Sequence, residues 1–259
     1  MAIEVFNRTE KKYQVDDATY QELRRRLEPY MEADAHSQNG DCYLICNIYY
    51  DTPCNELIRR SIDKPMYKEK LRLRSYGTKA LDDKVFLEIK KKYDGVVYKR
   101  RTKILLGDAY RFIENGYFTN ADGSTELPKF MNAQVTKELT YFINHYEGIQ
   151  PALYLSYERC AMFSKTDSSL RITFDRNITT RRYDLGLHYG NYGDKLLPDD
   201  RWVMEVKANQ AMPLWLAAML NELKVYPKSF SKYGTEYRKT RGLVNPKTNE
   251  EVETCLNPS

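Results

Sequence analysis

Several short segments of the sequence place charged side chains on every second residue, with apolar residues between them. The clearest runs from Lys70 to Arg74, where cations alternate with two leucines. Residues two apart share a face of a β-strand, so such a segment has one apolar side and one side rich in Lys and Arg. The pattern returns at residues 8–12, 85–92, 171–175 and 203–207, and carboxylates join the cations at Glu10, Glu88, Asp175 and Glu205.

The chemistry of these side chains suits a long polyanion with a bound metal ion. If the charged sides faced one another inside a closed barrel, the crowded cations would repel unless an anion or water filled the space. Arginine grips phosphate oxygens bidentately, and lysine supplies a compact charge. Carboxylates can hold Mg²⁺ or Mn²⁺ jointly with phosphates. A basic tunnel for polyphosphate or a nucleoside triphosphate is therefore one interpretation.

Two other interpretations fit the same pattern. The charged sides could simply face water, as in an ordinary half-exposed sheet. A flat basic sheet could bind RNA, because aromatic residues are interleaved with the cations. The carboxylates at Glu88, Asp175 and Glu205 would repel a nucleic acid, so we expect no nucleic-acid partner.

The familiar glycine-rich nucleotide loops are missing from the sequence. Side chains would then have to hold the phosphates of ATP. Ser231 and Lys232 could contribute to this, although their tetrapeptide, which ends at Gly234, also reads as an ordinary turn.

Composition and length favour one cytoplasmic domain. The chain has 259 residues without an obvious linker, and we expect a domain over residues 1–243 with a loose tail at 244–259. No apolar run approaches the roughly 20 residues that cross a bilayer, and no signal-peptide pattern is present, so direct membrane insertion is not expected. The five cysteines lack CxxC spacing, which predicts reduced thiols.

The expected fold class is α+β, with an antiparallel eight-stranded β-barrel tunnel and flanking helices. Asp16 or Asp17 should cap a helix that runs through Leu27 to Tyr30, with Pro29 near its end, and Pro213 should open another. Residues 107–146 read as helical with a break at 120–123. The expected strands cover residues 6–15, 44–51, 66–76, 84–92, 96–104, 152–163, 170–178 and 201–207, and the third and fourth should form a hairpin.

Eight ordered motifs resemble the VTC domain, the polyphosphate polymerase domain of the vacuolar transporter chaperone complex, in its stand-alone bacterial form. That domain belongs to the triphosphate tunnel metalloenzymes, which are CYTH-like. The motifs span about residues 3–240. They are RTEKKY from Arg8, YYDT from Tyr49, KLRLRSYG from Lys70, FLEIK from Phe86, YER from Tyr157, RITFD from Arg171, MEVK from Met204 and FSKY from Phe230.

The resemblance implies an enzyme that transfers the γ-phosphoryl of ATP to a growing polyphosphate chain, with Mn²⁺ or Mg²⁺. The catalytic residues would be Lys12, Arg72, Arg74, Lys90, Arg159, Arg171 and Lys232. The substrate-binding residues would be Arg8, Lys70, Lys92, Tyr157, Lys207 and Ser231, with Lys207 also suggested by its spacing from Glu205. The metal ligands would be Glu205, Glu88 and Glu10.

Two alternatives stay open beside the polymerase: an inorganic tripolyphosphatase or nucleoside triphosphatase on the same barrel, and a module that binds polyphosphate without turnover. Arg8 stands where other tunnel enzymes carry the first glutamate of an ExExK pattern, which removes one potential metal ligand. The sequence shows neither an SPX-type helical domain nor transmembrane segments, so inositol phosphate control is not expected. Whether a partner protein anchors the domain to a membrane is left open.

Overall fold

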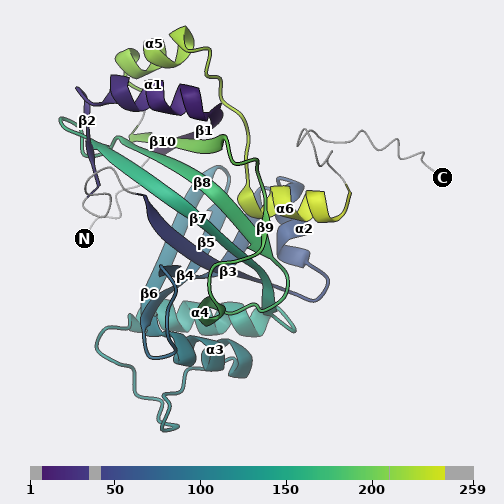
Figure 1. The fold of residues 1–259 in the computed structure, drawn as a ribbon. Coiled ribbons are helices and arrows are strands. Elements are labelled where there is room, and N and C mark those ends of the chain that lie inside the picture. The colour runs from purple at the N-terminus through teal and green to yellow at the C-terminus, as the bar shows by residue number, and fades with distance from the viewer. Residues whose placement is uncertain (1–7, 35–41, 210, 243–259) are drawn as a thin grey trace. The chain divides into compact units, whose positions relative to one another are not determined.

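The computed structural model describes residues 8–34, 42–209 and 211–242 (Figure 1). Its strands are β1 (Arg8–Asp16), β2 (Met31–Ala33), β3 (Tyr43–Asp51), β4 (Tyr67–Tyr76), β5 (Lys84–Tyr93), β6 (Val96–Leu105), β7 (Gln150–Ser164), β8 (Arg171–Arg181), β9 (Asp194–Lys195) and β10 (Arg201–Asn209). Its α-helices are α1 (Asp17–Leu27), α2 (Glu56–Ile62), α3 (Leu106–Asn115), α4 (Ala133–His145), α5 (Leu214–Glu222) and α6 (Lys232–Thr240), and a 3₁₀ turn, η2, covers Leu187–Tyr189.

The strands form one ten-stranded sheet in the order β1-β10-β8-β7-β3-β4-β5-β6, with β2 beside β7 and β9 beside β8. The pairs β1–β10, β10–β8, β4–β5 and β5–β6 are antiparallel, as predicted. The eight long strands match the expected number, while β2 and β9 are too short to show an alternating pattern. Among the described residues the strand path ends at β1 and β6, so the sheet is open rather than closed. Side-chain alternation determines the faces of a strand and does not determine closure.

Contacts gather the chain into two compact units. The first unit comprises residues 1–45, 156–179 and 197–230, and the second comprises residues 46–155, 180–196 and 231–259. Our expectation of one domain over residues 1–243 stays a prediction, and the tail at 244–259 lies outside the described residues.

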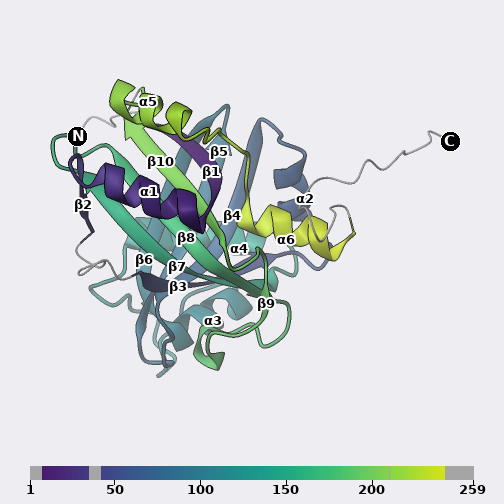
Figure 2. The same cartoon turned by 45° about the horizontal axis from the view of Figure 1, so that its top comes forward.

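The core of the first unit lies where α1 and α5 cover the apolar side of β1, β10 and β8 (Figure 2). Asp16 caps α1 by accepting the backbone N–H of Thr19 at 2.9 Å, which confirms the predicted helix start. The ring of Tyr20 stacks on Trp202 with 3.7 Å between centroids. Trp202 itself is 1% exposed, so this stack is a central part of the core.

The second unit is covered by α3 and α4 on the apolar side of β5 and β6. Leu71, Leu73, Leu87 and Ile89 on β4 and β5 are fully buried. The other side of the same strands carries most of their charged residues, apart from the pair Glu69–Lys91. No helix in the described part of the chain is both long and apolar enough to span a membrane.

Two helices of the second unit, α2 and α6, were not predicted. The carboxylate of Asp51 accepts the backbone N–H groups of Leu57 and Ile58 at the start of α2. The hydroxyl of Ser231 accepts the N–H of Gly234 and so caps α6. The segment read as a turn or a phosphate contact is thus the beginning of a helix.

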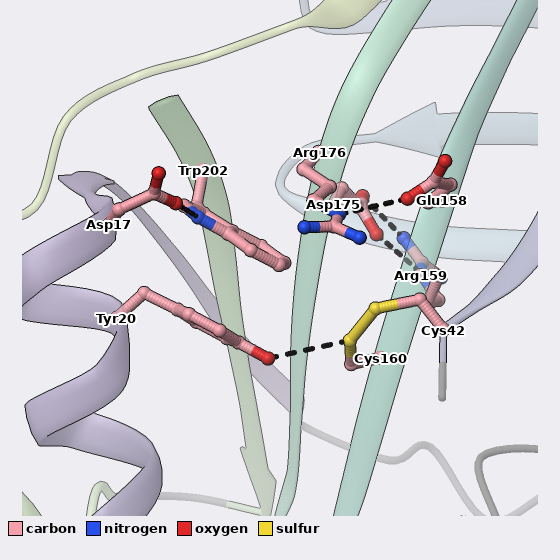
Figure 3. The surroundings of a disulfide bond; sticks show 9 residues. All are labelled: Asp17, Tyr20, Cys42, Glu158, Arg159, Cys160, Asp175, Arg176 and Trp202. Carbon is pink, nitrogen blue, oxygen red and sulfur yellow. Dashed lines mark hydrogen bonds and ion pairs between the residues drawn. A yellow bond between two sulfur atoms is a disulfide. The ribbon is translucent and has the colours of Figure 1, made fainter. Parts of the chain in front are cut away.

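A disulfide joins Cys42 to Cys160 (Figure 3), so the expectation of reduced thiols is wrong for this pair. The two cysteines are 118 residues apart in sequence, and spacing along the chain could not show that they are neighbours. Cys46 and Cys54 are free.

We predict that Trp202→Ala lowers the free energy of unfolding by about 3–5 kcal/mol, since it removes a large buried aromatic side chain. Denaturant unfolding of the purified protein measures this. The control is Leu214→Ala, because Leu214 is 88% exposed and its truncation should change stability by less than about 0.5 kcal/mol. Equal effects of the two substitutions would contradict this description of the core.

Candidate functional site

The charged side of β4, β5 and β6 in the second unit is strongly cationic. Over the stretch in which all three strands are paired (residues 67–74, 86–93 and 96–103), register and alternation place one carboxylate, Glu88, among nine cations. Directly opposed pairs include Lys70 with Lys90 and Lys90 with Lys99. Like charges this close repel, so the face is suited to an anion. The nine cations, which we call the basic face, are Lys68, Lys70, Arg72, Arg74, Lys90, Lys92, Lys99, Arg101 and Lys103.

Glu88 lies among the cations of the basic face, opposite Arg72 on β4 and Arg101 on β6. Its side chain is 2% exposed and accepts hydrogen bonds from Arg72 Nε at 3.0 Å, and Lys99 Nζ lies 2.7 Å from its other oxygen. Burial alone would raise the pKa of Glu88, but the charges of Arg72, Arg74 and Lys99 outweigh burial and lower it to about 2. Glu88 is therefore a fixed anion that orients Arg72.

Tyr49 on β3 is a member of this site that sequence reasoning missed as a functional residue. Its hydroxyl accepts a hydrogen bond from Arg72 Nη1 at 3.2 Å, and Arg72 lies 5.7 Å from the centre of its ring. Burial would raise the pKa of Tyr49, yet Arg72, Lys70 and Arg74 lower it to about 8. Arg74 is oriented similarly, because its Nε donates to Asn47 at 2.9 Å.

The charged side of the first unit contains both carboxylates and cations, which form ion pairs with one another. On β1 and β10, the ammonium of Lys12 lies 3.2 Å from Glu10 and 3.7 Å from Glu205, and Lys207 lies 2.8 Å from Glu205. Burial would raise the pKa of Glu205, but Lys207, Lys12 and Arg159 lower it to about 2. Glu205 therefore remains ionised between two lysines.

Two arginines complete this side of the first unit. Arg159 makes a bidentate pair with the buried Asp175, at 2.6 and 2.8 Å (Figure 3), and lies over the ring of Tyr157. Arg171 pairs with Asp34 at 3.3 Å. Each arginine is thus positioned by a carboxylate, and neither Asp34 nor Asp175 was expected to have that role.

The predicted site residues fall into two sets. Within the first unit, the structure brings together Lys12, Glu10, Glu205, Lys207, Arg159, Tyr157 and Arg171, and Arg8 joins them on β1, although its side chain lies outside the described part. Within the second unit, it brings together Lys70, Arg72, Arg74, Glu88, Lys90 and Lys92. Ser231 and Lys232 lie at the start of α6.

The three predicted metal ligands are divided between the units. Glu10 and Glu205 lie on paired strands of the first unit, and Glu88 belongs to the second. Within the described ranges, no group of three or more His, Cys, Asp or Glu side chains could hold a metal ion. Mg²⁺ is commonly held by one or two carboxylates plus substrate phosphates, and the pair Glu10–Glu205 fits that smaller requirement.

The sequence matches the VTC domain family over residues 7–241, which is most of the chain, and the protein belongs to this family. No curated protein matches the sequence.

Solved structures share the fold at low sequence identity. A putative adenylate cyclase from Bacillus halodurans is 15% identical with a TM-score of 0.51, and the match covers 86% of this chain and 92% of that one. A putative adenylyl cyclase from Hippeastrum, described as having a dominant triphosphatase activity, is 16% identical with a TM-score of 0.50 and coverage of 94% and 99%. These likenesses confirm the antiparallel, sheet-dominated α+β fold with flanking helices, whereas the expected closure into an eight-stranded barrel is not found among the described residues.

We predict that one tyrosine of the protein ionises near pH 8 and that this titration is lost in Tyr49→Phe. The cations around Tyr49 favour its phenolate, whereas burial raises the pKa of Tyr13, Tyr20 and Tyr110 above the ordinary value. Ultraviolet absorbance of tyrosinate during a pH titration measures it. Adding tripolyphosphate should move this ionisation to higher pH, since phosphate charge offsets the cations. An unchanged titration in Tyr49→Phe would contradict the described surroundings.

Proposed function

We propose that this protein is a metal-dependent polyphosphate polymerase, which transfers the γ-phosphoryl of ATP to an inorganic polyphosphate chain. The observation that carries the proposal is the basic face, with nine cations around a single carboxylate on β4, β5 and β6. Polyphosphate carries charge at every unit, so a row of closely spaced cations can neutralise it along its length. Membership of the VTC domain family supports the same reaction.

The residues of the chain would bind and orient phosphates. Arg72 is held between Glu88 and Tyr49, so its guanidinium is preorganised for a phosphoryl group. In the transfer, the bond from the γ-phosphorus to the β,γ-bridging oxygen breaks, and a bond forms to a terminal oxygen of the chain. ADP leaves with the bridging oxygen. The acceptor oxygen is already ionised, so no strong general base is required.

Glu10 and Glu205 would hold the Mn²⁺ or Mg²⁺ ion. Both lie within 4 Å of the Lys12 ammonium, Glu10 at 3.2 Å and Glu205 at 3.7 Å, and their oxygens are the ligand type that hard cations prefer. When bound, the ion would supply positive charge that offsets the charge of phosphate oxygens. Glu88 remains a weaker candidate for this role, because Arg72 and Lys99 already engage its two oxygens.

A tripolyphosphatase or nucleoside triphosphatase is the second candidate. The structural likeness to the Hippeastrum protein, whose description names a dominant triphosphatase activity, favours it. In that case a carboxylate such as Glu205 would orient water toward the same phosphorus. A module that binds polyphosphate without turnover is the third.

ATP and polyphosphate are the proposed partners, with no nucleic acid and no direct membrane insertion. Any membrane-anchoring protein is unknown. A cytoplasmic location is also part of the proposal, and the Cys42–Cys160 disulfide weighs against it, because reducing compartments keep thiols reduced.

Incubation with ATP and Mn²⁺, followed for ADP, acid-stable chains and orthophosphate, separates the three candidates. The polymerase predicts ADP in step with growing chains. Orthophosphate without chains would establish the hydrolase, and no ADP would leave the binding module.

We predict that Glu205→Gln reduces turnover at least about 100-fold while polyphosphate binding persists, since it removes a metal ligand and leaves the basic face intact. Parallel turnover and binding assays measure this. Glu158→Gln is the matched control, because Glu158 pairs with Arg176 on the opposite side of the sheet and should leave turnover unchanged. Full turnover in Glu205→Gln would exclude this residue as the metal ligand.

A further inference from the structure

Thr173, in the middle of β8, is a buried residue whose hydroxyl has no partner. Its side chain is 3% exposed, and among the described residues nothing accepts from or donates to its Oγ1 atom. Buried polar atoms are nearly always hydrogen-bonded, because an unpaired one loses its hydration without compensation. The unpaired hydroxyl of Thr173 at this buried position therefore needs an explanation.

The hydroxyl lies on the charged side of the strand. Alternation along β8 places Thr173 on the same face as Arg171 and Asp175, while Ile172 and Phe174 are buried in the core on the other side. Across the ladder, Thr173 is directly opposite Glu205, and Arg171 is opposite Lys207. Thr173 thus lies on the same side of the first unit as Glu205 and Lys207.

A second unpaired donor lies two residues away. The Nε atom of Arg171 is buried and also lacks a hydrogen-bond partner in the described part of the chain, although Nη2 of the same side chain donates to Asp34 at 3.3 Å. Two donors, one neutral and one cationic, therefore occupy one face of one strand. Nearby Glu205 does not satisfy Thr173, and its carboxylate is engaged by Lys207 at 2.8 Å.

We propose that Thr173 Oγ1 and Arg171 Nε together donate hydrogen bonds to an oxyanion of the phosphate chain, which makes Thr173 a substrate-binding residue. The inference rests on the proposed function and adds a contact to it. A phosphate oxygen has several lone pairs and full negative charge, so it can accept from both donors at once. Valine at this position would pack equally well and would be free of the unpaired hydroxyl.

The test compares Thr173→Val with Thr173→Ser in tripolyphosphate binding by calorimetry without metal, and in thermal unfolding. We expect Thr173→Val to bind about tenfold more weakly while its Tm stays equal or rises, because an unsatisfied buried hydroxyl has been removed. Thr173→Ser keeps the hydroxyl and should bind within about threefold of the unaltered protein. If Thr173→Val does not fold, Thr173→Ala against Thr173→Ser gives the same comparison.

Thr102→Val is the matched control. Thr102 is also buried, but its hydroxyl accepts from Asn132 at 2.8 Å, so this substitution should lower the Tm and leave affinity unchanged. Unchanged affinity in Thr173→Val, whatever its Tm, would overturn the inference and leave the proposed function standing. Failure of the unaltered protein to bind tripolyphosphate would instead contradict the proposed function itself.

Discussion

The second unit must offset the electrostatic repulsion among the cations of the basic face. Nine cations share one side of three strands, and Glu88 alone among the carboxylates of those strands lies within them. Its ion pairs with Arg72 and Lys99 offset part of the repulsion. The repulsion that is not offset acts on Lys99. Burial and the charges of Arg72 and Arg74 outweigh the attraction of Glu88 and lower the pKa of Lys99 to about 8. A bound polyanion would relieve this repulsion, so the same charges that limit stability would favour an anionic ligand.

The apolar sides of the strands make this arrangement possible. In the first unit α1 and α5 cover one side of β1, β10 and β8, and in the second unit α3 and α4 cover β5 and β6. A one-residue slip in register would exchange the two faces of a strand. It would bury the charged side chains in the cores, so the observed register is strongly favoured. Placing functional groups on strands also fixes them more accurately than loops do. The pairs Arg72–Glu88 and Arg159–Asp175 show how each arginine is then oriented.

The alternating pattern was sufficient to predict the long strands and which of their charged residues share a face, because period-two patterning and burial follow the same geometry. The two short helices could not be predicted this way. Helix α2 depends on Asp51 accepting backbone N–H groups, and α6 on the Ser231 cap. Contacts between residues distant in sequence were also missed, among them Arg171–Asp34, Arg159–Asp175, Arg72–Tyr49 and the disulfide Cys42–Cys160. Those contacts depend on tertiary structure, and the resemblance to the VTC domain named only the motif residues.

The most direct test of the central claim is the affinity of long-chain polyphosphate for the protein as the salt concentration rises. Several cations neutralising one chain should release bound counterions, as for nucleic acids, so affinity should fall steeply, with a log–log slope of at least about 3. A slope near zero, or no binding at low salt, would contradict the claim that the basic face exists to hold a phosphate chain.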